Sequence, residues 1–309
     1  MINILVVTSL NSGSVHPFIK EQVETISNKF EVHYDYFFIK RKGIIGYLKE
    51  TRRLKNYLKA SSTKFDLIHS HYGLSGMTAI FQTSIKKIVT FHGSDINYIP
   101  HRLISQLVIF FTDYSIFVTN NLKEKVLKRD HLVIPCGINT DVKPLSKSEA
   151  RTELGWEKDS IKILFASNFK RPEKNPDLAI EVVNTLKDKY KDIELIELSG
   201  FSREGVNIRM CACDALLLTS SREGSPQVIK EALYFRLPIV ATDVGVIRDI
   251  LKDTDQTYIC TFQKEDLAQA LEKVIKNGMR IKDNSNFNKY DNNLIANDVY
   301  QVYLKVMSK

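Results

Sequence analysis

Two glutamates, Glu223 and Glu231, stand in a segment whose residue types suit the binding of a phosphorylated ligand. Ser225 is a good N-cap residue, and Pro226 suits the first helical position because proline lacks the amide donor that would be unpaired there. The sequence therefore predicts a helix that begins at Ser225. The residue before it, Gly224, lets the backbone come close to a ligand.

The start of this helix would offer free amides and the positive end of a dipole to a phosphate or diphosphate. The expected lining residues are Gly224, Ser225, Pro226 and Gln227. Glu223 would lie in the loop at the mouth, and Glu231 about 8 Å further along the helix at 1.5 Å per residue. Carboxylates on both sides of a diphosphate can accept hydrogen bonds from hydroxyl groups, as a nucleotide-sugar requires. The alternative is an ordinary capped helix with a solvated face, which the two glutamates alone would favour.

The residues that follow strengthen the first interpretation. Residues 237–242 are typical of a short buried strand, and residues 243–245 of the turn at its carboxyl end, where open α/β sheets bind ligands. The whole segment resembles the Glu-x7-Glu signature of family 4 of the retaining glycosyltransferases, which have the GT-B fold. This resemblance implies that Glu223 contacts the transferred sugar and that Glu231 holds the ribose diol of the nucleotide.

A second loop, residues 167–177, carries cations between a predicted strand and a predicted helix. Lys174 and Arg171 are suited to neutralise the charge that builds on a departing diphosphate, Arg171 with a bidentate fork. The family pattern is a Gly-Arg pair followed by a lysine, and Lys174-Asn175 matches its second half. Because residues 167–168 depart from the first half, we expect Arg171 as the substitute, with Asn168 and Lys170 as alternatives. A solvated loop without a role is the less favoured interpretation.

In the first half of the chain, residues 89–95 follow a predicted strand and resemble the family's strand-end histidine motif. The resemblance implies that His92 donates to a hydroxyl or phosphate of the donor and that Asp95 belongs to the same site. A purely structural histidine is the alternative. His69 and His71 lack carboxylates at a helical metal-binding spacing, so no metal site is expected.

Three further residues are assigned to the donor by resemblance. Gly13 belongs to a reduced form of the family's N-terminal glycine loop, where the backbone would approach a phosphate. Gly200 and Phe201 lie in a segment, residues 198–203, that resembles the family's glycine loop beside the nucleobase.

The order of predicted elements is that of a doubly wound α/β protein. Apolar runs at residues 2–8, 32–39, 66–70, 87–91, 115–119 and 131–135 predict parallel strands, with helices such as 22–30 and 73–84 between them. Residues 135–148 interrupt the pattern, which restarts at 161–166. We therefore expect two facing Rossmann-like domains of the GT-B type. Their predicted limits are residues 1–140 on the acceptor side and 141–290 for the nucleotide-sugar, with 291–309 forming a helix that crosses back to the first.

Composition sets limits that agree with this assignment. The 309 residues are 43% hydrophobic and 26% charged, as in an ordinary globular protein. No apolar run approaches the roughly 20 residues of a membrane span, and residues 1–7 lack the features of a signal peptide. The four cysteines, Cys136, Cys211, Cys213 and Cys260, lack metal spacing. We expect a protein of the reducing cytoplasm, with Cys211 and Cys213 in the core.

Residues 40–59 concentrate positive charge, with eight basic residues against the single acid Glu50. Apolar residues recur between them at helical spacing, which predicts a basic amphipathic helix. Such a helix can lie on an anionic membrane surface or pack on its own domain with a solvated basic face, and the sequence leaves both open. Nucleic acid is a weaker third partner, because no binding motif accompanies the charge.

The resemblance implies a retaining, metal-independent glycosyltransferase that uses a nucleotide-diphosphate-sugar as substrate and needs no cofactor. The implied acceptor is a hydroxyl of a glycan or lipid-linked glycan in surface-polysaccharide synthesis, reached in the cytoplasm or on the inner face of the membrane. No residue stands out as a covalent nucleophile. The alternatives are a catalytically silent nucleotide-sugar-binding subunit and a GT-B epimerase or phosphorylase.

Overall fold

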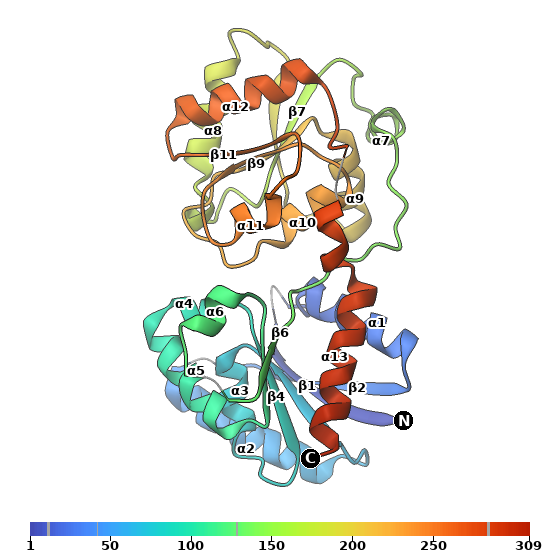
Figure 1. Ribbon diagram of the computed structural model, residues 1–309, viewed down its shortest axis with the longest axis vertical. Helices are drawn as coiled ribbons and strands as arrows, with labels where there is room; N and C mark the ends of the chain where they lie inside the picture. Colours follow the sequence, from blue (N-terminus) through green and yellow to red (C-terminus); the bar gives the residue numbers. More distant parts are fainter. Residues whose placement is uncertain (11–12, 42, 128, 283–284) are drawn as a thin grey trace. The chain divides into compact units, whose positions relative to one another are not determined.

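A computed structural model describes residues 1–10, 13–41, 43–127, 129–282 and 285–309 of the chain (Figure 1). They form two compact units, one of residues 1–139 with 290–309 and one of residues 140–289, here called unit 1 and unit 2. Each unit contains a single sheet whose paired strands all run parallel. The prediction of two Rossmann-like, parallel-sheet domains is confirmed.

Unit 1 is built on a six-stranded sheet in the order β2-β1-β3-β4-β5-β6. Its strands are β1 (Ile2–Ser9), β2 (Val32–Ile39), β3 (Leu67–His71), β4 (Lys86–Phe91), β5 (Tyr114–Phe117) and β6 (His131–Val133). Its helices are α1 (Pro17–Lys29), α2 (Gly43–Ala60), α3 (Gly73–Ala79), α4 (Ser94–Asn97), α5 (Ile99–Phe111), α6 (Asn120–Glu124) and α13 (Asn292–Met307).

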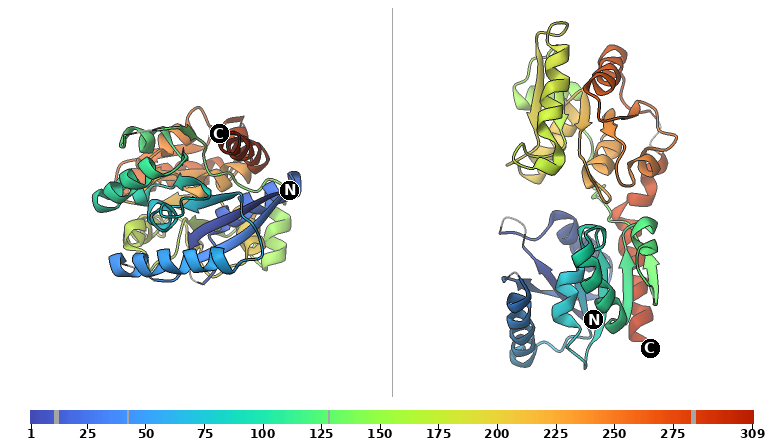
Figure 2. Two further views of the ribbon diagram at one scale, coloured as in Figure 1. Left: turned by 90° about the horizontal axis from the view of Figure 1, so that it is seen from below. Right: turned by 90° about the vertical axis from the view of Figure 1, so that its left-hand side faces the viewer.

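Helices cover both faces of this sheet. The crossover through α1 moves from β1 to β2 in one direction along the sheet, whereas those through α2, α3 and α5 move in the other. Because such crossovers are right-handed, α1 lies on one face and the other three on the opposite face. Consistent with this, α3 packs against both α2 and α5, and α1 packs against α13. Figure 2 shows α2 (blue) and α13 (red) on opposite sides of the sheet.

The last helix completes the core of unit 1. Buried side chains of α13, among them Ile295, Val299 and Val302, belong to one cluster with residues of β1, β3, β4 and β5. The segment before the helix is tied to the end of the first part of the unit, because the amide of Asn292 donates to the carbonyl of Ile138 at 3.0 Å.

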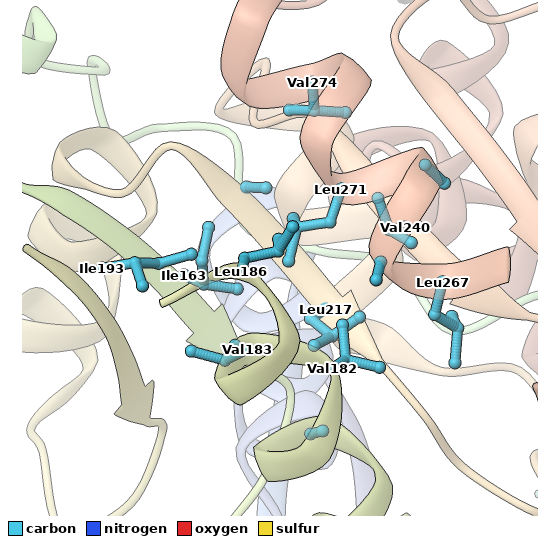
Figure 3. Close-up of a cluster of buried hydrophobic side chains, with 14 of the residues drawn as sticks. Ile163, Val182, Val183, Leu186, Ile193, Leu217, Val240, Leu267, Leu271 and Val274 are labelled. Atoms are coloured by element: carbon cyan, nitrogen blue, oxygen red, sulfur yellow. The ribbon is translucent and has the colours of Figure 1, made fainter. Parts of the chain in front are cut away.

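Unit 2 has a five-stranded sheet in the order β11-β10-β9-β7-β8. Its strands are β7 (Ile161–Phe165), β8 (Ile193–Glu197), β9 (Ala215–Leu218), β10 (Ile239–Thr242) and β11 (Thr257–Cys260). Its helices are α7 (Lys147–Leu154), α8 (Pro176–Leu186), α9 (Arg203–Ala212), α10 (Gln227–Tyr234), α11 (Ile247–Leu251) and α12 (Lys264–Asn277), with short 3-10 turns η1 (Pro172–Lys174) and η2 (Ser285–Tyr290). Figure 3 shows how β7, β9, β10, α8 and α12 meet in its core, where Ile163, Leu217, Val240 and Leu271 are fully buried.

Two predicted helices have different limits in the structure. α1 begins at Pro17, five residues before the predicted start at residue 22, because proline occupies the first helical turn there. The helix predicted over 73–84 ends at Ala79, and residues 80–85 form the turn into β4.

The cysteines carry no disulfide. Cys211, Cys213 and Cys260 are buried and Cys136 is half-buried, all with free thiols. Within the described ranges, no group of three or more His, Cys, Asp or Glu side chains is arranged to hold a metal ion. No described helix is both long and apolar enough to pass through a bilayer.

The packing of α13 can be tested by comparing two neighbouring positions. Ile295→Ala removes a side chain that is 2% exposed and is expected to lower the free energy of unfolding by about 2–5 kcal/mol. Leu294→Ala truncates a side chain that is 54% exposed and is expected to cost much less. Urea denaturation of both variants measures the difference, and equal losses would contradict the docking of this face of α13.

Candidate functional site

The predicted cation Lys174 and the predicted carboxylate Glu223 meet in unit 2. Lys174 ends η1, which follows β7, and Glu223 follows β9, the neighbour of β7 in the sheet. The ammonium of Lys174 donates to Oε1 of Glu223, and the hydroxyl of Ser220 donates to the same oxygen at 2.7 Å. The two charged side chains are only 11% and 10% exposed, so their interaction is weakly screened by water. The two predicted loops thus form one charged cluster at the carboxyl edge of the sheet.

Hydrogen bonds to backbone carbonyls join these two loops. The hydroxyl of Thr219 donates to the carbonyls of Lys174 and Asn175 at 2.9 and 2.8 Å. The amide of Ser221 donates to the carbonyl of Glu173 at 3.0 Å. The position of Lys174 relative to the loop that carries Glu223 is therefore fixed by the main chain as well as by the ion pair.

Gly245 closes the cluster from the turn after β10. Its φ is +62°, and a Cβ added there would lie 2.5 Å from the carbonyl oxygen of Glu223. A side chain at this position would be strained and would displace the loop of Glu223. The turn thus requires glycine at this position, because its backbone lies directly against the backbone of Glu223, a candidate catalytic residue.

The helix after Glu223 begins later than predicted. α10 starts at Gln227, and its N-cap is Pro226 with ψ 120° and no side-chain cap, so the prediction of Ser225 as N-cap was wrong. Pro226 stays in the extended conformation, which leaves Gly224 and Ser225 in the half-buried loop. At the first turn, the side-chain oxygen of Gln227 accepts a hydrogen bond at 2.7 Å from Lys230, which is fully buried.

Glu231 lies on the same helix and is held by an arginine. Its Oε1 is 2.8 Å from a guanidinium nitrogen of Arg203, the first residue of α9, and the two side chains are 12% and 37% exposed. Each of the two predicted carboxylates therefore has its own cation, Lys174 for Glu223 and Arg203 for Glu231.

The aromatic ring of the predicted nucleobase loop, Phe201, stacks on Arg209 of α9. The guanidinium of Arg209 lies 3.4 Å from the ring centroid of Phe201, while Phe201 remains 39% exposed. Gly200 before it has φ +76°, and no atom lies within 4 Å of where its Cβ would be. Phe201 is thus an aromatic surface supported by a cation, a suitable platform for a flat ring.

The other residues considered for the family arginine role, Arg171, Asn168 and Lys170, lie in the same loop as Lys174. Arg171 pairs with Glu173 at 2.7 Å, and half of its side chain is exposed. Asn168 accepts a hydrogen bond from the amide of Lys170 at 3.1 Å. Arg171 contacts Lys174 through the backbone, its carbonyl accepting from the amide of Lys174 at 2.9 Å, while its guanidinium pairs with Glu173. The assignment of the family arginine among the three residues stays a prediction.

In unit 1, His92 lies at the carboxyl end of β4. Its Nε2 is 3.0 Å from Nδ1 of His71, and its Nδ1 is 3.4 Å from the sulfur of Cys136. Because both ring nitrogens contact protein groups, a hydrogen bond from His92 to a donor sugar would require the release of one of them. Its role at the donor stays a prediction.

Asp95 supports the turn that carries His92. Its carboxylate accepts from the amides of Gly73 at 3.1 Å, His92 at 3.2 Å and Gly93 at 2.8 Å, and it is 2% exposed. Burial raises the pKa of the Asp95 carboxyl, and these amide hydrogen bonds act in the opposite direction. The structure thus gives Asp95 a positioning role, whereas the direct donor contact predicted from the resemblance stays a prediction.

Two buried histidines stand behind His92. The rings of His69 and His71 stack with centroids 4.5 Å apart. His69 contacts the hydroxyls of Tyr303 and Thr90, each at 2.8 Å. Burial lowers the pKa of His69 to about 3 and holds that of His71 well below its usual range, so both are neutral at physiological pH.

The remaining predicted residue is Gly13, in the loop after β1. It is exposed with φ +85°. The two residues before it in the predicted glycine loop, Asn11 and Ser12, lie outside the described residues. Its contact with a phosphate stays a prediction.

Sequence reasoning missed three residues of the unit 2 cluster. Ser220 lies two residues after the end of β9, and this place near a strand end was a usable signal. Arg203 ended the predicted nucleobase loop without being given a role. Lys230 was given no role, and nothing in its spacing indicated that it is buried.

Family models match both units. Residues 9–142 match the model described as Glycosyltransferase Family 4, and residues 196–293 match the model described as Glycosyl transferases group 1.

Curated proteins and a solved structure agree with these matches. A putative teichuronic acid biosynthesis glycosyltransferase, TuaC of Bacillus subtilis, is 27% identical over 67% of this chain and 60% of its own length. The phosphatidylinositol N-acetylglucosaminyltransferase GPI3 subunit of Saccharomyces cerevisiae is 25% identical over 78% of this chain and 57% of its own length. The chain thus spans about three fifths of these relatives. Anabaena Alr3699/HepE, solved in complex with UDP, has the same fold, with a TM-score of 0.74, 14% identity and coverage of 99% and 100% of the two chains.

The buried histidines predict a pH dependence of stability. An unfolded chain binds a proton at His69 below about pH 6.5, whereas the folded protein resists protonation until about pH 3, so stability falls as pH decreases through this window. Between pH 7 and pH 5 this residue accounts for about 2 kcal/mol of lost stability, at 1.36 kcal/mol per pH unit below 6.5. Urea denaturation at the two pH values measures this loss. Between pH 7 and pH 5, the free energy of unfolding of His69→Gln should fall by about 2 kcal/mol less than that of the wild type.

Tyr303→Phe is the matched control for this measurement. It removes the same 2.8 Å hydrogen bond but leaves the titrating ring in place, so it should lower stability about equally at both pH values. If His69→Gln kept the wild-type dependence on pH, burial of a neutral His69 would be contradicted.

Proposed function

We propose that this chain, which belongs to the family 4 glycosyltransferases, moves a sugar from a nucleotide-diphosphate-sugar to an acceptor hydroxyl. The observation that carries the proposal is the buried pair of Lys174 and Glu223, at the edge of the sheet where α/β proteins bind ligands. The matches of both units to glycosyltransferase family models support it.

In the proposed donor complex, unit 2 holds the nucleotide. Glu231 accepts hydrogen bonds from the ribose diol, and Phe201 stacks on the nucleobase. The exposed ring of Phe201, with Arg209 on one of its faces, supports this assignment. UDP in the complex of Alr3699/HepE supports a nucleoside diphosphate as the ligand class.

Transfer is proposed to proceed with retention and without a metal ion. Lys174, Arg171 and the backbone amides near residues 224–227 would stabilise the charge on the departing diphosphate while the acceptor hydroxyl enters from the same face. Glu223 would contact the transferred sugar, and its fixed position beside Lys174 supports this role. In unit 1, His92 and Gly13 are proposed to contact the donor, and Asp95 is proposed to act through the turn of His92, whose amide it holds.

The acceptor is proposed to be a glycan or lipid-linked glycan of surface-polysaccharide synthesis, on the cytoplasmic face of a membrane. Two relatives support this class. TuaC is named for teichuronic acid biosynthesis, and GPI3 for transfer to phosphatidylinositol. A catalytically silent subunit is the second candidate, because the GPI3 relative is itself named a subunit.

The donor site can be tested by thermal shift with UDP-, GDP-, ADP- and CMP-sugars. A ligand at 100 times its dissociation constant should stabilise the protein by about 2.7 kcal/mol. Glu231→Ala should abolish the stabilisation, whereas Glu181→Ala, at an exposed position of α8, should keep it. If no nucleotide-sugar stabilised the wild type, the proposed donor site would be wrong.

Catalysis can be separated from donor binding with Glu223→Gln. The amide keeps the shape and the contact with Ser220 but loses the charge, so kcat should fall by about 10²–10³-fold while the affinity for the free nucleoside diphosphate stays near that of the wild type. Glu181→Gln is the control.

The same assay distinguishes the proposed mechanism from its alternatives. Turnover should survive EDTA, and NMR of the product should show the anomeric configuration of the donor. Inversion would overturn the retaining mechanism, and the absence of product from purified protein would favour the silent subunit. Consumption of the donor without an acceptor, giving an epimer, would favour an epimerase.

A further inference from the structure

The outward face of α5 in unit 1 consists of apolar side chains. Successive members are four, four, three and one residues apart, which places them all on one side of a helix. They are Ile99, Leu103, Leu107, Phe110 and Phe111, with exposed fractions of 65, 70, 43, 46 and 58%, and are here called the apolar stripe. A contiguous exposed surface of this kind is unusual on a soluble protein and typical of an interaction site.

The polar side chains of α5 do not interrupt the stripe, because they are bonded to nearby backbone. Arg102 donates to the carbonyl of Ile96 at 2.7 Å. Gln106 donates to the carbonyl of Leu127 at 2.9 Å and accepts from the amide of Leu127 at 2.7 Å. Leu127 is itself 70% exposed and extends the apolar surface beside the helix. The opposite face of α5, with Val108 and Ile109, is buried in the core.

The second helix on this side of the sheet, α2, is positively charged on its outward face. Leu54 is fully buried, and Tyr47, Tyr57 and Leu58 pack around the same core, so the helix is attached to its own unit. Four cations remain exposed along it, Lys49, Arg52, Lys55 and Lys59, here called the cationic strip. The only acid of α2, Glu50, is buried and pairs with Arg41 and Arg53.

The cationic strip continues into further exposed apolar residues. Ile45 and Leu48, which precede Lys49 on α2, are 70% and 58% exposed. Because α3 packs against both α2 and α5, the strip and the stripe belong to one layer of helices on one face of the sheet. The layer thus combines positive charge with large apolar side chains and presents no acid from either helix on its outer side.

We propose that this layer docks on an anionic phospholipid membrane, with the apolar stripe entering the boundary between headgroups and acyl chains. The cationic strip would contact the anionic headgroups at the same time. Aromatic and aliphatic side chains are stable in this boundary, and lysine and arginine are attracted to its negative surface. A symmetric pairing of two copies through the same layer would bring two cationic strips together, so charge favours the lipid surface over self-association.

The inference rests on the proposed function in one respect, namely that docking would bring the enzyme to a lipid-linked acceptor. The docking surface involves none of the residues proposed to bind the donor or to act in transfer. Membrane binding is therefore measurable without donor, acceptor or turnover, and it can fail while the donor site stands.

The test is flotation of the full chain with vesicles of phosphatidylcholine, with and without phosphatidylglycerol. The wild type should float with the anionic vesicles. Leu103→Asn/Phe111→Asn should lose binding at least about tenfold at low and at high salt, because it removes apolar contact. Arg52→Glu should also lower binding to the anionic vesicles about tenfold or more at low salt, because each unit of charge contributes about fivefold. At high salt its loss of binding should be much smaller, because salt screens the attraction.

Leu294→Asn/Leu304→Asn is the matched control, because it changes two exposed leucines of α13 on the opposite face of the same unit. It should float like the wild type. Thermal shift with the nucleotide-sugar should be the same in all variants, which shows that they are folded and separates this test from that of the donor site.

Three results would overturn the proposal. The first is a wild type that does not float with anionic vesicles. The second is a stripe variant that floats as well as the wild type. The third is a dimer in analytical ultracentrifugation that the stripe variant dissociates, without any binding to vesicles, which would assign the layer to self-association.

Discussion

Parallel strand pairing is the constraint on which the rest of this structure depends. In each sheet it brings every strand-to-helix loop to the same edge, so residues distant in sequence become neighbours without a long excursion of the chain. Lys174 after β7 and Glu223 after β9 meet in this way. His71 at the end of β3, His92 after β4 and Cys136 beyond β6 do so in unit 1. The charged cluster of unit 2 and the histidine cluster of unit 1 are two results of one topological rule.

Much of the fold followed from local pattern, because short apolar runs separated by turn residues identify parallel strands well. β2 and the central strands lie where these runs predicted them. The limits of helices were harder to predict. Pro226 fits either the first turn of a helix or an extended N-cap, and only its contacts in the folded loop decide between them.

The candidate site was predictable as residue types and spacing, but its pairings were not. Nothing in the sequence near Glu231 indicates that Arg203 is its partner, because the contact depends on how α9 and α10 pack. The same limit applies to surfaces. The apolar sequence of α5 is compatible with a fully buried helix, and only the packed structure shows that five large side chains face outward. Periodicity reports that a face is apolar but does not report what covers it.

The place of α13 in the fold has a consequence for how the protein is made. Unit 2 is continuous in sequence, so it has all its elements once its last residue has left the ribosome. Unit 1 is synthesised first, yet Ile4, Leu67 and Ile88 share their core cluster with a helix that follows the whole of unit 2. During translation α1 covers part of this face of the older sheet, and the apolar side chains that α13 will bury stay open to chaperones or to misassociation. The order of synthesis is therefore the reverse of the order in which the two cores can be completed.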